Sequence, residues 1–186
     1  MSQIPEYEIL EQKAEEKLGK ALGGETRIEL IKEYNAETIR IIREIDHKKF
    51  REELQYSGDE IEERMKKQGF LCVLIYLDDE PIAFEYGYDM GDGVYFSDSQ
   101  ASLIEGKGVG TTQFALEILY LYHRGYSGVR LSTEEMDEQG RALRSFWEKM
   151  GFVKLGENED GNVDMELTLT PEAAEYQYRR YILPRS

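Results

Sequence analysis

The residues with the clearest chemical potential lie in a glycine-rich stretch, residues 103–112, which reads Leu-Ile-Glu-Gly-Lys-Gly-Val-Gly-Thr-Thr. Its three glycines, Gly106, Gly108 and Gly110, leave the backbone free to adopt positive φ angles and to turn amide N–H groups toward one point. An apolar helical pattern follows directly, and the first turn of a helix adds unpaired N–H groups and partial positive charge. This combination predicts an anion cradle, for which phosphate is the usual ligand.

Spacing excludes the common phosphate-binding loops. A Walker A loop needs a glycine, four residues and then Gly-Lys-Ser/Thr, and no glycine stands in that relation to Lys107. The dinucleotide fingerprint G-x-G-x-x-G fails by one residue, because Thr111 occupies the place of the third glycine. Taken alone, the stretch could equally be a glycine-rich turn between a strand and a helix that binds no ligand.

The elements that must position this loop follow from the pattern of apolar residues. Strands are predicted over residues 26–33, 70–77, 82–88, 94–101, 128–133, 152–155 and 163–169. Helices are predicted over residues 35–50 and 57–69, directly after the glycine loop, and over 139–150. The central strands are joined by short turns, which indicates an antiparallel meander. The predicted organisation is a helical N-terminal extension (1–24), one domain (25–170) and a helical C-terminal tail (171–186).

A second stretch, residues 145–153, lies about 40 residues after the loop and reads Ser-Phe-Trp-Glu-Lys-Met-Gly-Phe-Val. It resembles the Leu-Tyr-Glu-Lys-Leu-Gly-Phe signature of the GNAT superfamily of N-acetyltransferases. The glycine loop is similar to that family's pyrophosphate loop, Gln/Arg-x-x-Gly-x-Gly/Ala, and the order of elements over about residues 26–169 is also that of the family. The resemblance implies an α/β (α+β) fold: one GNAT-like domain with a mixed, mostly antiparallel sheet of about seven strands, flanked by helices and splayed between the fourth and fifth strands.

The resemblance also implies acetyl-CoA as cosubstrate and no metal. The pantetheine arm would lie between the strands over 94–101 and 128–133, where backbone amides would polarise the thioester carbonyl. Acceptor pockets of this fold come largely from the first two helices and the last hairpin, here residues 35–68 and 156–163. The residues expected at the cofactor are Gln100, Ser102, Glu105, Gly106, Lys107, Gly108, Val109, Gly110, Thr111 and Trp147.

Two residues depart from the family's pattern. Glu105 stands where Gln or Arg is usual, and its carboxylate would repel a pyrophosphate unless it turns to solvent or pairs with a cation such as Lys107 or Arg141. Trp147 stands where many members have the tyrosine that protonates the departing thiolate, and an indole N–H is no practical proton source. Trp147 could simply be a core aromatic residue, in which case the acid comes from elsewhere or from solvent, or is not needed.

The implied reaction transfers an acetyl group to a primary amine, on a small cationic molecule or on a protein or peptide, by direct attack in a ternary complex. A protonated amine needs a base, and Asp98 is the first candidate. It shares one face of its predicted strand with Val94, Phe96 and Gln100 in strict alternation, and partial burial would raise its pKa toward neutrality. Glu85 on the preceding strand is the second candidate. Asp98 could equally be a solvated strand residue.

Two other classes of protein stay open. One is a GNAT-fold module that binds an acyl-CoA as a sensor without turnover, which Glu105 and Trp147 favour. The other is a structural or interaction protein whose acidic surface and tyrosine-rich tail bind a basic partner.

Composition narrows the partners. Acidic residues number 38 and basic residues 23, giving a formal charge of −15, which repels nucleic acid and attracts cationic substrates, although the acidity could also serve only solubility. Cys72 is the sole cysteine, so no intrachain disulfide can form. There is no secretory signal pattern, and no apolar run approaches the ~18 residues of a membrane span. These features predict a cytoplasmic protein without membrane contact, and its assembly could be a homodimer.

Overall fold

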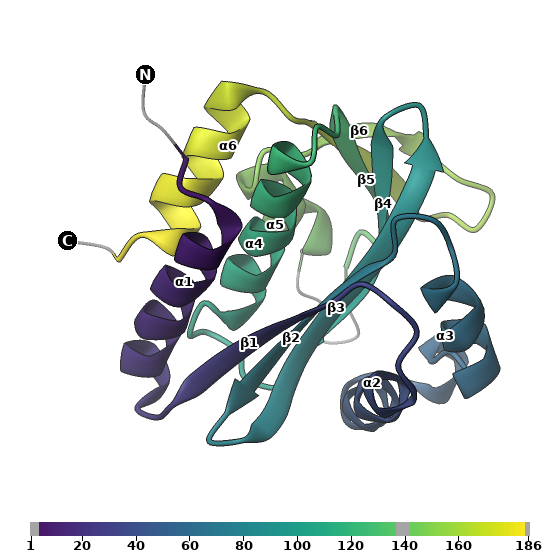
Figure 1. Ribbon diagram of the computed structural model, residues 1–186. Coiled ribbons are helices and arrows are strands. Elements are labelled where there is room, and N and C mark those ends of the chain that lie inside the picture. The colour runs from purple at the N-terminus through teal and green to yellow at the C-terminus, as the bar shows by residue number, and fades with distance from the viewer. Residues whose placement is uncertain (1–3, 137–141, 185–186) are drawn as a thin grey trace.

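A computed structural model describes residues 4–136 and 142–184 of the chain. Its centre is a seven-stranded sheet in the order β1-β2-β3-β4-β5-β7-β6 (Figure 1). The strands are β1 (Thr26–Ile31), β2 (Leu71–Leu77), β3 (Glu80–Gly91), β4 (Val94–Ser102), β5 (Gly128–Thr133), β6 (Val153–Glu157) and β7 (Val163–Thr168). The predicted antiparallel meander of β2, β3 and β4 is confirmed by their registers.

Six α-helices flank the sheet: α1 (Tyr7–Leu22), α2 (Ala36–Lys49), α3 (Gly58–Met65), α4 (Val109–His123), α5 (Leu143–Lys149) and α6 (Pro171–Gln177). A 3₁₀ turn, η1 (Glu52–Leu54), precedes α3, and a π turn, η2 (Tyr178–Ile182), follows α6. The predicted start of the fifth helix at residue 139 lies outside the described residues. None of the described helices is long and apolar enough to cross a membrane.

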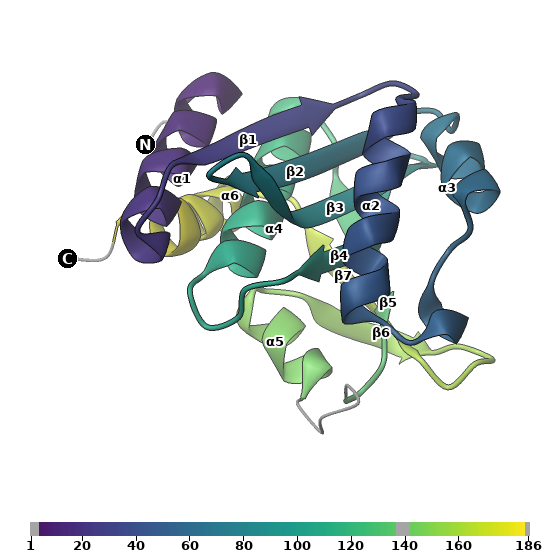
Figure 2. The same ribbon diagram turned by 90° about the horizontal axis from the view of Figure 1, so that it is seen from below.

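The helices form two layers on opposite faces of the sheet. Figure 1 shows α1, α4, α5 and α6 on one side, and Figure 2 looks onto the other face, across which α2 runs with α3 beside it. Each face has its own apolar core. Ten of the fifteen residues of α4 are buried, because the sheet covers one side of this helix while α1 and α6 cover another. The helices at both ends of the chain thus share the core of α4, and the division at residues 25 and 170 stays a prediction.

Strands β4 and β5 run parallel but pair over only three residue pairs, Val94–Gly128, Tyr95–Val129 and Phe96–Arg130. Beyond Phe96 the two strands are no longer paired in the described part of the chain. The prediction of a sheet splayed between its fourth and fifth strands is therefore confirmed. The splay leaves the second half of β4 without a neighbour on its β5 side, directly before the glycine loop.

A β-bulge lies where the splay begins. Tyr86 pairs with Ser99, but the next residue, Gly87, pairs with Ser97, so Asp98 is an extra residue in β4. Gly87 fits this close approach because a Cβ there would lie 2.1 Å from the carbonyl oxygen of Phe96. The extra residue interrupts the alternation of side chains along β4.

The bulge corrects one prediction. Gln100 was expected on the same face as Asp98, but it pairs with Glu85, whose side chain faces α4, while Asp98 faces α3. Strict alternation is valid only for an unbroken ladder, and one extra residue shifts every later side chain to the other face.

Candidate active site

The glycine loop connects β4 to α4 and has the conformation that its sequence suggests at two of three glycines. Gly106 and Gly108 have φ angles of +76° and +83°, in the left-handed region that favours glycine. Gly110 lies in the first turn of α4 and does not use that freedom. Gly108 is the N-cap of α4 and, having no side chain, leaves the first helical amides uncapped.

The backbone amides of this loop are available to a ligand. From residue 106 to residue 111, no N–H donates a hydrogen bond to any described part of the chain. A Cβ placed on Gly106 or Gly110 would meet nothing within 4 Å, so the surface over these two glycines is open. Consecutive free amides at the positive end of a helix are the arrangement that an anion cradle requires, and anion binding at this loop stays a prediction.

Both ends of the loop are fixed by contacts that the sequence did not indicate. At the β4 end, the hydroxyl of Ser102 donates to the carbonyl of Ile104 at 2.8 Å and accepts from its amide at 3.3 Å. At the α4 end, Thr112 donates to the carbonyl of Tyr181 at 3.2 Å and accepts from Lys17 at 3.0 Å. The first and last helices of the chain therefore hold the start of α4, where the free amides lie.

Glu105 is paired with a cation that the sequence did not indicate. Lys49, in the last turn of α2, contacts its carboxylate at 2.5 Å. Lys107 makes no such pair within residues 4–136 and 142–184, and Arg141 lies outside these described residues. The pair is half-exposed, so it partly offsets the negative charge beside the loop without burying it.

Trp147 lies in the core and only 5% of it is exposed. Its ring centroid is 4.6 Å from that of Phe114, and it meets Phe146 and Phe152 at edge-on angles. These contacts fix α5 against α4 and correspond to the core aromatic residue considered above. A contact between Trp147 and the cofactor stays a prediction.

Asp98, the extra residue of the bulge, lies at the centre of a polar group that we call the Asp98 cluster, made of Asp98, Tyr56, Arg64 and Tyr88. Nε of Arg64 donates to Oδ2 of Asp98 at 2.8 Å, as does the hydroxyl of Tyr88 at 2.7 Å, while the hydroxyl of Tyr56 donates to Oδ1 at 2.9 Å. The Asp98 side chain is only 5% exposed. Three donors, one of them cationic, satisfy the oxygens of this carboxylate.

The two tyrosines of the Asp98 cluster remain donors at neutral pH. Burial, and then the charge of Asp98, raise the pKa of Tyr56 to about 12. Burial and the hydrogen bond to Asp98 raise the pKa of Tyr88 as well. Neither hydroxyl therefore ionises near pH 7, and both keep the proton that they donate to the carboxylate.

The second candidate base, Glu85, lies on the opposite face of the sheet in what we call the Glu85–Glu117 pair. Both carboxyls are fully buried, between β3 and α4. The hydroxyl of Ser97 donates to one oxygen of Glu85 at 3.1 Å, and the other three oxygens of the pair have no hydrogen-bond partner among the described residues. Burial, and then Glu117, raise the pKa of Glu85 well above its usual value, and burial raises that of Glu117 to about 8.

Sequence reasoning missed the partners of both carboxylate groups. Tyr56 and Arg64 reach Asp98 from 42 and 34 residues earlier in the chain, and no local pattern links them. Glu117 did leave a signal, because it is an acidic residue in a helical run that is otherwise almost wholly apolar. An ionisable residue at a position that must be buried is a candidate for a perturbed pKa.

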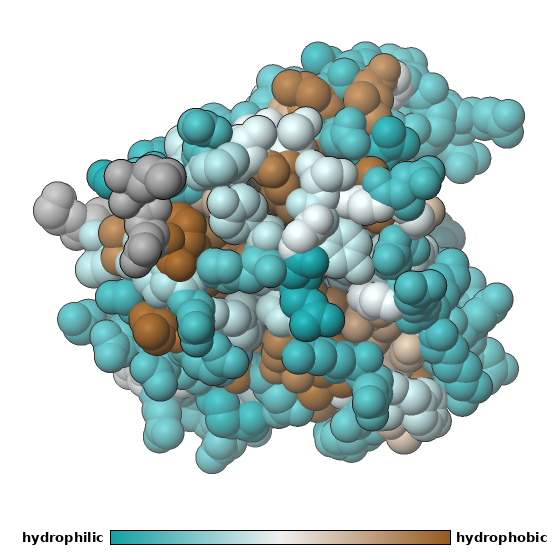
Figure 3. Space-filling model, turned by 45° about the horizontal axis from the view of Figure 1, so that its top comes forward, coloured by the Kyte–Doolittle hydropathy of each residue, from teal (hydrophilic) through white to brown (hydrophobic). Residues whose placement is uncertain are grey.

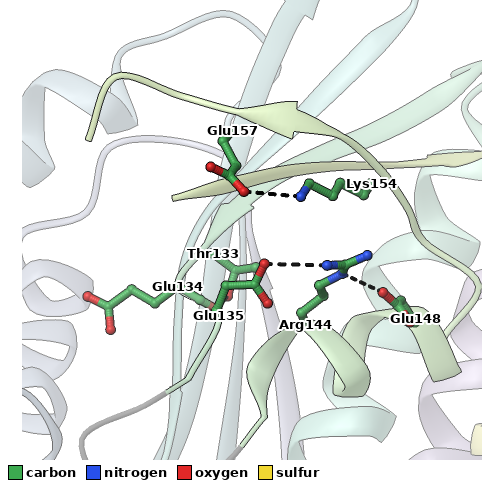
Figure 4. Close-up of polar contacts among 7 residues, drawn as sticks. All are labelled: Thr133, Glu134, Glu135, Arg144, Glu148, Lys154 and Glu157. Atoms are coloured by element: carbon green, nitrogen blue, oxygen red, sulfur yellow. Dashed lines mark hydrogen bonds and ion pairs between the residues drawn. The ribbon is translucent and has the colours of Figure 1, made fainter. Parts of the chain in front are cut away.

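The other flank of the splay, around the end of β5, carries exposed ion pairs (Figure 4). Arg144 of α5 contacts Glu148 at 2.6 Å and Glu135 at 3.4 Å, and Lys154 contacts Glu157 at 3.2 Å. No aromatic ring is recorded against the Arg144 guanidinium in the described residues. Arg144 is therefore, like Arg64, paired with carboxylates, but at the exposed surface and without an aromatic ring against it in the described residues.

Two hollows of the described surface lie away from this site. One, of about 520 Å³, lies between α5, β7 and α6, and another, of about 690 Å³, lies on the outer side of α2. Both are open to solvent, and neither includes the glycine loop or Asp98. Figure 3 shows one face of the molecule, on which apolar side chains form only small patches among hydrophilic ones. The candidate site is therefore defined by the splay, the glycine loop and the buried polar groups, and not by either of these hollows.

Comparison with solved structures identifies the fold. An aminoglycoside 6'-N-acetyltransferase complexed with coenzyme A matches with a TM-score of 0.66 and 16% identity, over 77% of this chain and 97% of that one. The ribosomal-protein-S18-alanine N-acetyltransferase of Escherichia coli matches with a TM-score of 0.64 and 13% identity, over 78% and 94%. The PaiA N-acetyltransferase of Thermoplasma acidophilum, in complex with coenzyme A, matches with a TM-score of 0.60 and 17% identity, over 76% and 98%.

No protein-family model matches the chain, and no curated protein matches it in sequence. At identities this low the structural likeness establishes the fold. The chain has the fold of the GNAT N-acetyltransferases, as its glycine loop and order of elements predicted.

Proposed function

We propose that this protein is an N-acetyltransferase that moves the acetyl group of acetyl-CoA to a primary amine by direct attack in a ternary complex. The observation that carries the proposal is the open end of the β4–β5 splay beside a loop with free amides at residues 106–111. Coenzyme A presents a pyrophosphate and a long pantetheine arm, and these two features fit an anion cradle followed by an unpaired strand edge.

In this proposal the residues after the bulge hold the cofactor. Amides of the glycine loop, with Lys107 at its exposed tip, bind the pyrophosphate. The backbone of β4 around Gln100 and Ser102 binds the pantetheine and orients the thioester. The amine nitrogen attacks the thioester carbonyl carbon, the C–S bond breaks, and the thiolate of coenzyme A leaves. Holding both reactants in line can supply ~7–11 kcal/mol of the barrier.

Asp98 is the proposed base for the acceptor. It lies at the start of the splay, on the face lined by α3, and its charged form is supported by three donors. A carboxylate there attracts a protonated amine and takes its proton, directly or through a water, which frees the nitrogen lone pair for the attack. The strongly acidic chain favours a cationic acceptor, either a small amine or a peptide.

A non-catalytic acyl-CoA sensor is the second candidate, and the burial of Trp147 favours it. With Trp147 packed in the core, no acid stands where many members of the fold have a tyrosine for the departing thiolate. A sensor would bind acetyl-CoA through the same loop without releasing its thiol.

One experiment separates these functions. Acetyl-CoA is incubated with the protein and a panel of polyamines, amino sugars and peptides, and free thiol is measured beside the melting temperature with acetyl-CoA alone. We expect acetyl-CoA to raise the melting temperature and at least one amine to release thiol. A raised melting temperature without thiol release from any amine would support the sensor. No effect of acetyl-CoA would support a plain interaction protein.

Two glycine variants localise the binding. Gly108→Ala forces a side chain into a left-handed position, at a cost of roughly 1–2 kcal/mol, and we expect acetyl-CoA to bind about tenfold more weakly. Gly110→Ala is the matched control, because its Cβ meets nothing and the family's pattern allows alanine there. We expect this control to bind acetyl-CoA within twofold of the unmodified chain, and equal losses in both variants would place the cofactor elsewhere.

A further inference from the structure

Within the Asp98 cluster, Asp98 and Tyr56 contact the guanidinium of Arg64 as a receptor contacts a cationic ligand. The central carbon of the guanidinium lies 3.8 Å from the centre of the Tyr56 ring, and Nε contacts the nearly buried carboxylate of Asp98 at 2.8 Å. An aromatic face and a desolvated carboxylate are the two groups that bind alkylammonium and alkylguanidinium ions most strongly in proteins. The same pattern continues at Tyr88, where the ammonium of Lys67 lies 4.2 Å from the ring centre.

The interior behind this cluster holds acceptors that Arg64 does not use. The hydroxyl of Tyr86 and Oδ1 of Asp46 are buried and have no hydrogen-bond partner among the described residues. Tyr86 is fully buried and only 2% of Asp46 is exposed. Burial, and then the charge of Asp98, raise the pKa of Tyr86, so its hydroxyl lies within the field of the cluster. Buried polar atoms of this kind are normally hydrogen-bonded.

Arg64 is held at the cluster by an element with few anchors. It lies in the last turn of α3, which buries only Ile61 and Met65, and the preceding η1 buries no residue. Its other recorded hydrogen bond, from Nη1 to the carbonyl of Glu60, is within its own helix. Outside its own helix, the polar and ring contacts of the guanidinium in the described residues are those to Asp98 and to the Tyr56 ring.

The cluster also lies where an acceptor is needed. Asp98 is the bulged residue, two positions past Phe96, the last residue of β4 that pairs with β5, so a cation bound there is at the opening of the splay. We infer that Tyr56, Tyr88 and Asp98 form the cation-binding subsite for the acceptor, and that Arg64 occupies it until an alkylammonium or alkylguanidinium group displaces it. This inference rests on the proposed function, whose acceptor it narrows to amines that enter as cations.

The first test removes the resident cation and supplies a free one. In Arg64→Ala, 10 mM methylguanidinium chloride should raise the melting temperature by about 3–6 °C relative to 10 mM sodium chloride, as a ligand does when it binds only the folded state. The matched control is Arg144→Ala, which removes an arginine held by two carboxylates at the surface. Methylguanidinium should shift this control by less than 1 °C. Equal shifts in the two variants, or none in Arg64→Ala, would overturn the inference.

A second test needs no variant to fold. In ¹⁵N-labelled unmodified protein, the Nε–H signal of Arg64 should exchange slowly with water because Asp98 accepts its proton. Adding butylammonium chloride should speed that exchange at least threefold, with the Nε–H signals of other arginines as controls. An exchange rate that does not change at saturating amine would mean that Arg64 is a permanent structural partner of Asp98.

Neither test uses acetyl-CoA or turnover. If thiol release fails while methylguanidinium binds Arg64→Ala, the subsite stands and the transferase proposal falls. If thiol release succeeds while both cation tests fail, the transferase stands and its acceptor binds elsewhere.

Discussion

Two groups of carboxyls lie on opposite faces of the same strands, and the fold gives them very different numbers of hydrogen-bond donors. In the Asp98 cluster one carboxylate accepts three hydrogen bonds, one from a guanidinium. In the Glu85–Glu117 pair one donor, the hydroxyl of Ser97, serves a single oxygen of Glu85, and the other three oxygens have no partner among the described residues. The first environment stabilises negative charge, and the second stabilises the protonated form. The protonation state of a carboxyl therefore depends more on the hydrogen-bond donors around it than on whether it belongs to Asp or Glu.

The bulge determines which β4 side chains after Asp98 face α4. Before Asp98, the β4 side chains that face α4 include Ser97, which reaches Glu85. After Asp98, the face toward α4 is occupied by Gln100, opposite Glu85. One extra residue thus turns Gln100, rather than Ser99, toward the Glu85–Glu117 pair, while Asp98 stays on the face of Val94 and Phe96, toward α3.

The largest expected effect tests which face performs the chemistry. Under the proposed function, Asp98→Asn removes the base but keeps the shape of the side chain, and kcat/KM should fall by ~10²–10⁴. Glu85→Gln is the counterpart on the other face and should change kcat/KM by less than threefold, because its carboxyl is buried and holds its proton. Steady-state thiol release with the best amine measures both. A larger loss in Glu85→Gln would reverse the assignment of the two faces.

The pH dependence of stability tests the protonated pair. Glu117 has a pKa of about 8 in the folded chain against a usual value of 4.5, so between these values the folded state holds a proton that the unfolded state has lost. Its contribution to stability is complete below about pH 4.5 and is lost as the pH rises through 8. Glu117→Gln removes this titration, and the variant should gain stability relative to the unmodified chain as the pH rises, by about 3–4 kcal/mol or roughly 6–16 °C by pH 8.

The control for this experiment is Glu16→Gln, which removes an exposed glutamate in the middle of α1. Melting curves from pH 5 to pH 8 should show a constant difference between this control and the unmodified chain. If the Glu117→Gln difference were also independent of pH, the pair would be ionised in the folded state, and the contrast with Asp98 would disappear.

How much of this could be predicted from the sequence differs between the fold and the site. The order of elements was predictable because apolar residues recur with clear periods, and the loop was predictable because glycines mark positive φ. The bulge was not, since Val94, Phe96 and Asp98 alternate as in a regular strand. Its one trace is Gly87 in the partner strand, where the backbone of Phe96 comes too close for any side chain.

The chemistry of the site was less predictable than its position. Asp98 was a candidate base, but two of its donors, Tyr56 just before α3 and Arg64 in α3, lie 42 and 34 residues earlier, and contacts over such distances in the chain leave no local pattern. The same holds for Glu105, which was expected to pair with a cation and does so with Lys49, 56 residues earlier. Sequence spacing can place a charge on a strand or a loop, and only tertiary packing determines its partner.

The smallest expected effect concerns Glu105. Its carboxylate is exposed, unlike those of the Asp98 cluster and the Glu85–Glu117 pair. Glu105→Gln keeps the shape of the side chain, removes a negative charge beside the loop and leaves the ammonium of Lys49 near a bound pyrophosphate. The loss of repulsion amounts to roughly 0.5–1 kcal/mol at an exposed site, so the Kd for acetyl-CoA should fall about two- to fivefold. Because salt screens exposed charges, the gain should shrink at 0.5 M salt.

The matched control is Glu62→Gln, which breaks a glutamate–lysine pair of similar exposure on α3, where Glu62 contacts Lys66 at 3.3 Å. Its Kd for acetyl-CoA should not change, and neither variant should shift the melting temperature by more than about 2 °C, since exposed pairs contribute little. Calorimetric titration with acetyl-CoA at two salt concentrations measures the difference. An unchanged Kd in Glu105→Gln would mean that Lys49 already neutralises the carboxylate fully, and an exposed charge would then be as well compensated as the buried one at Asp98.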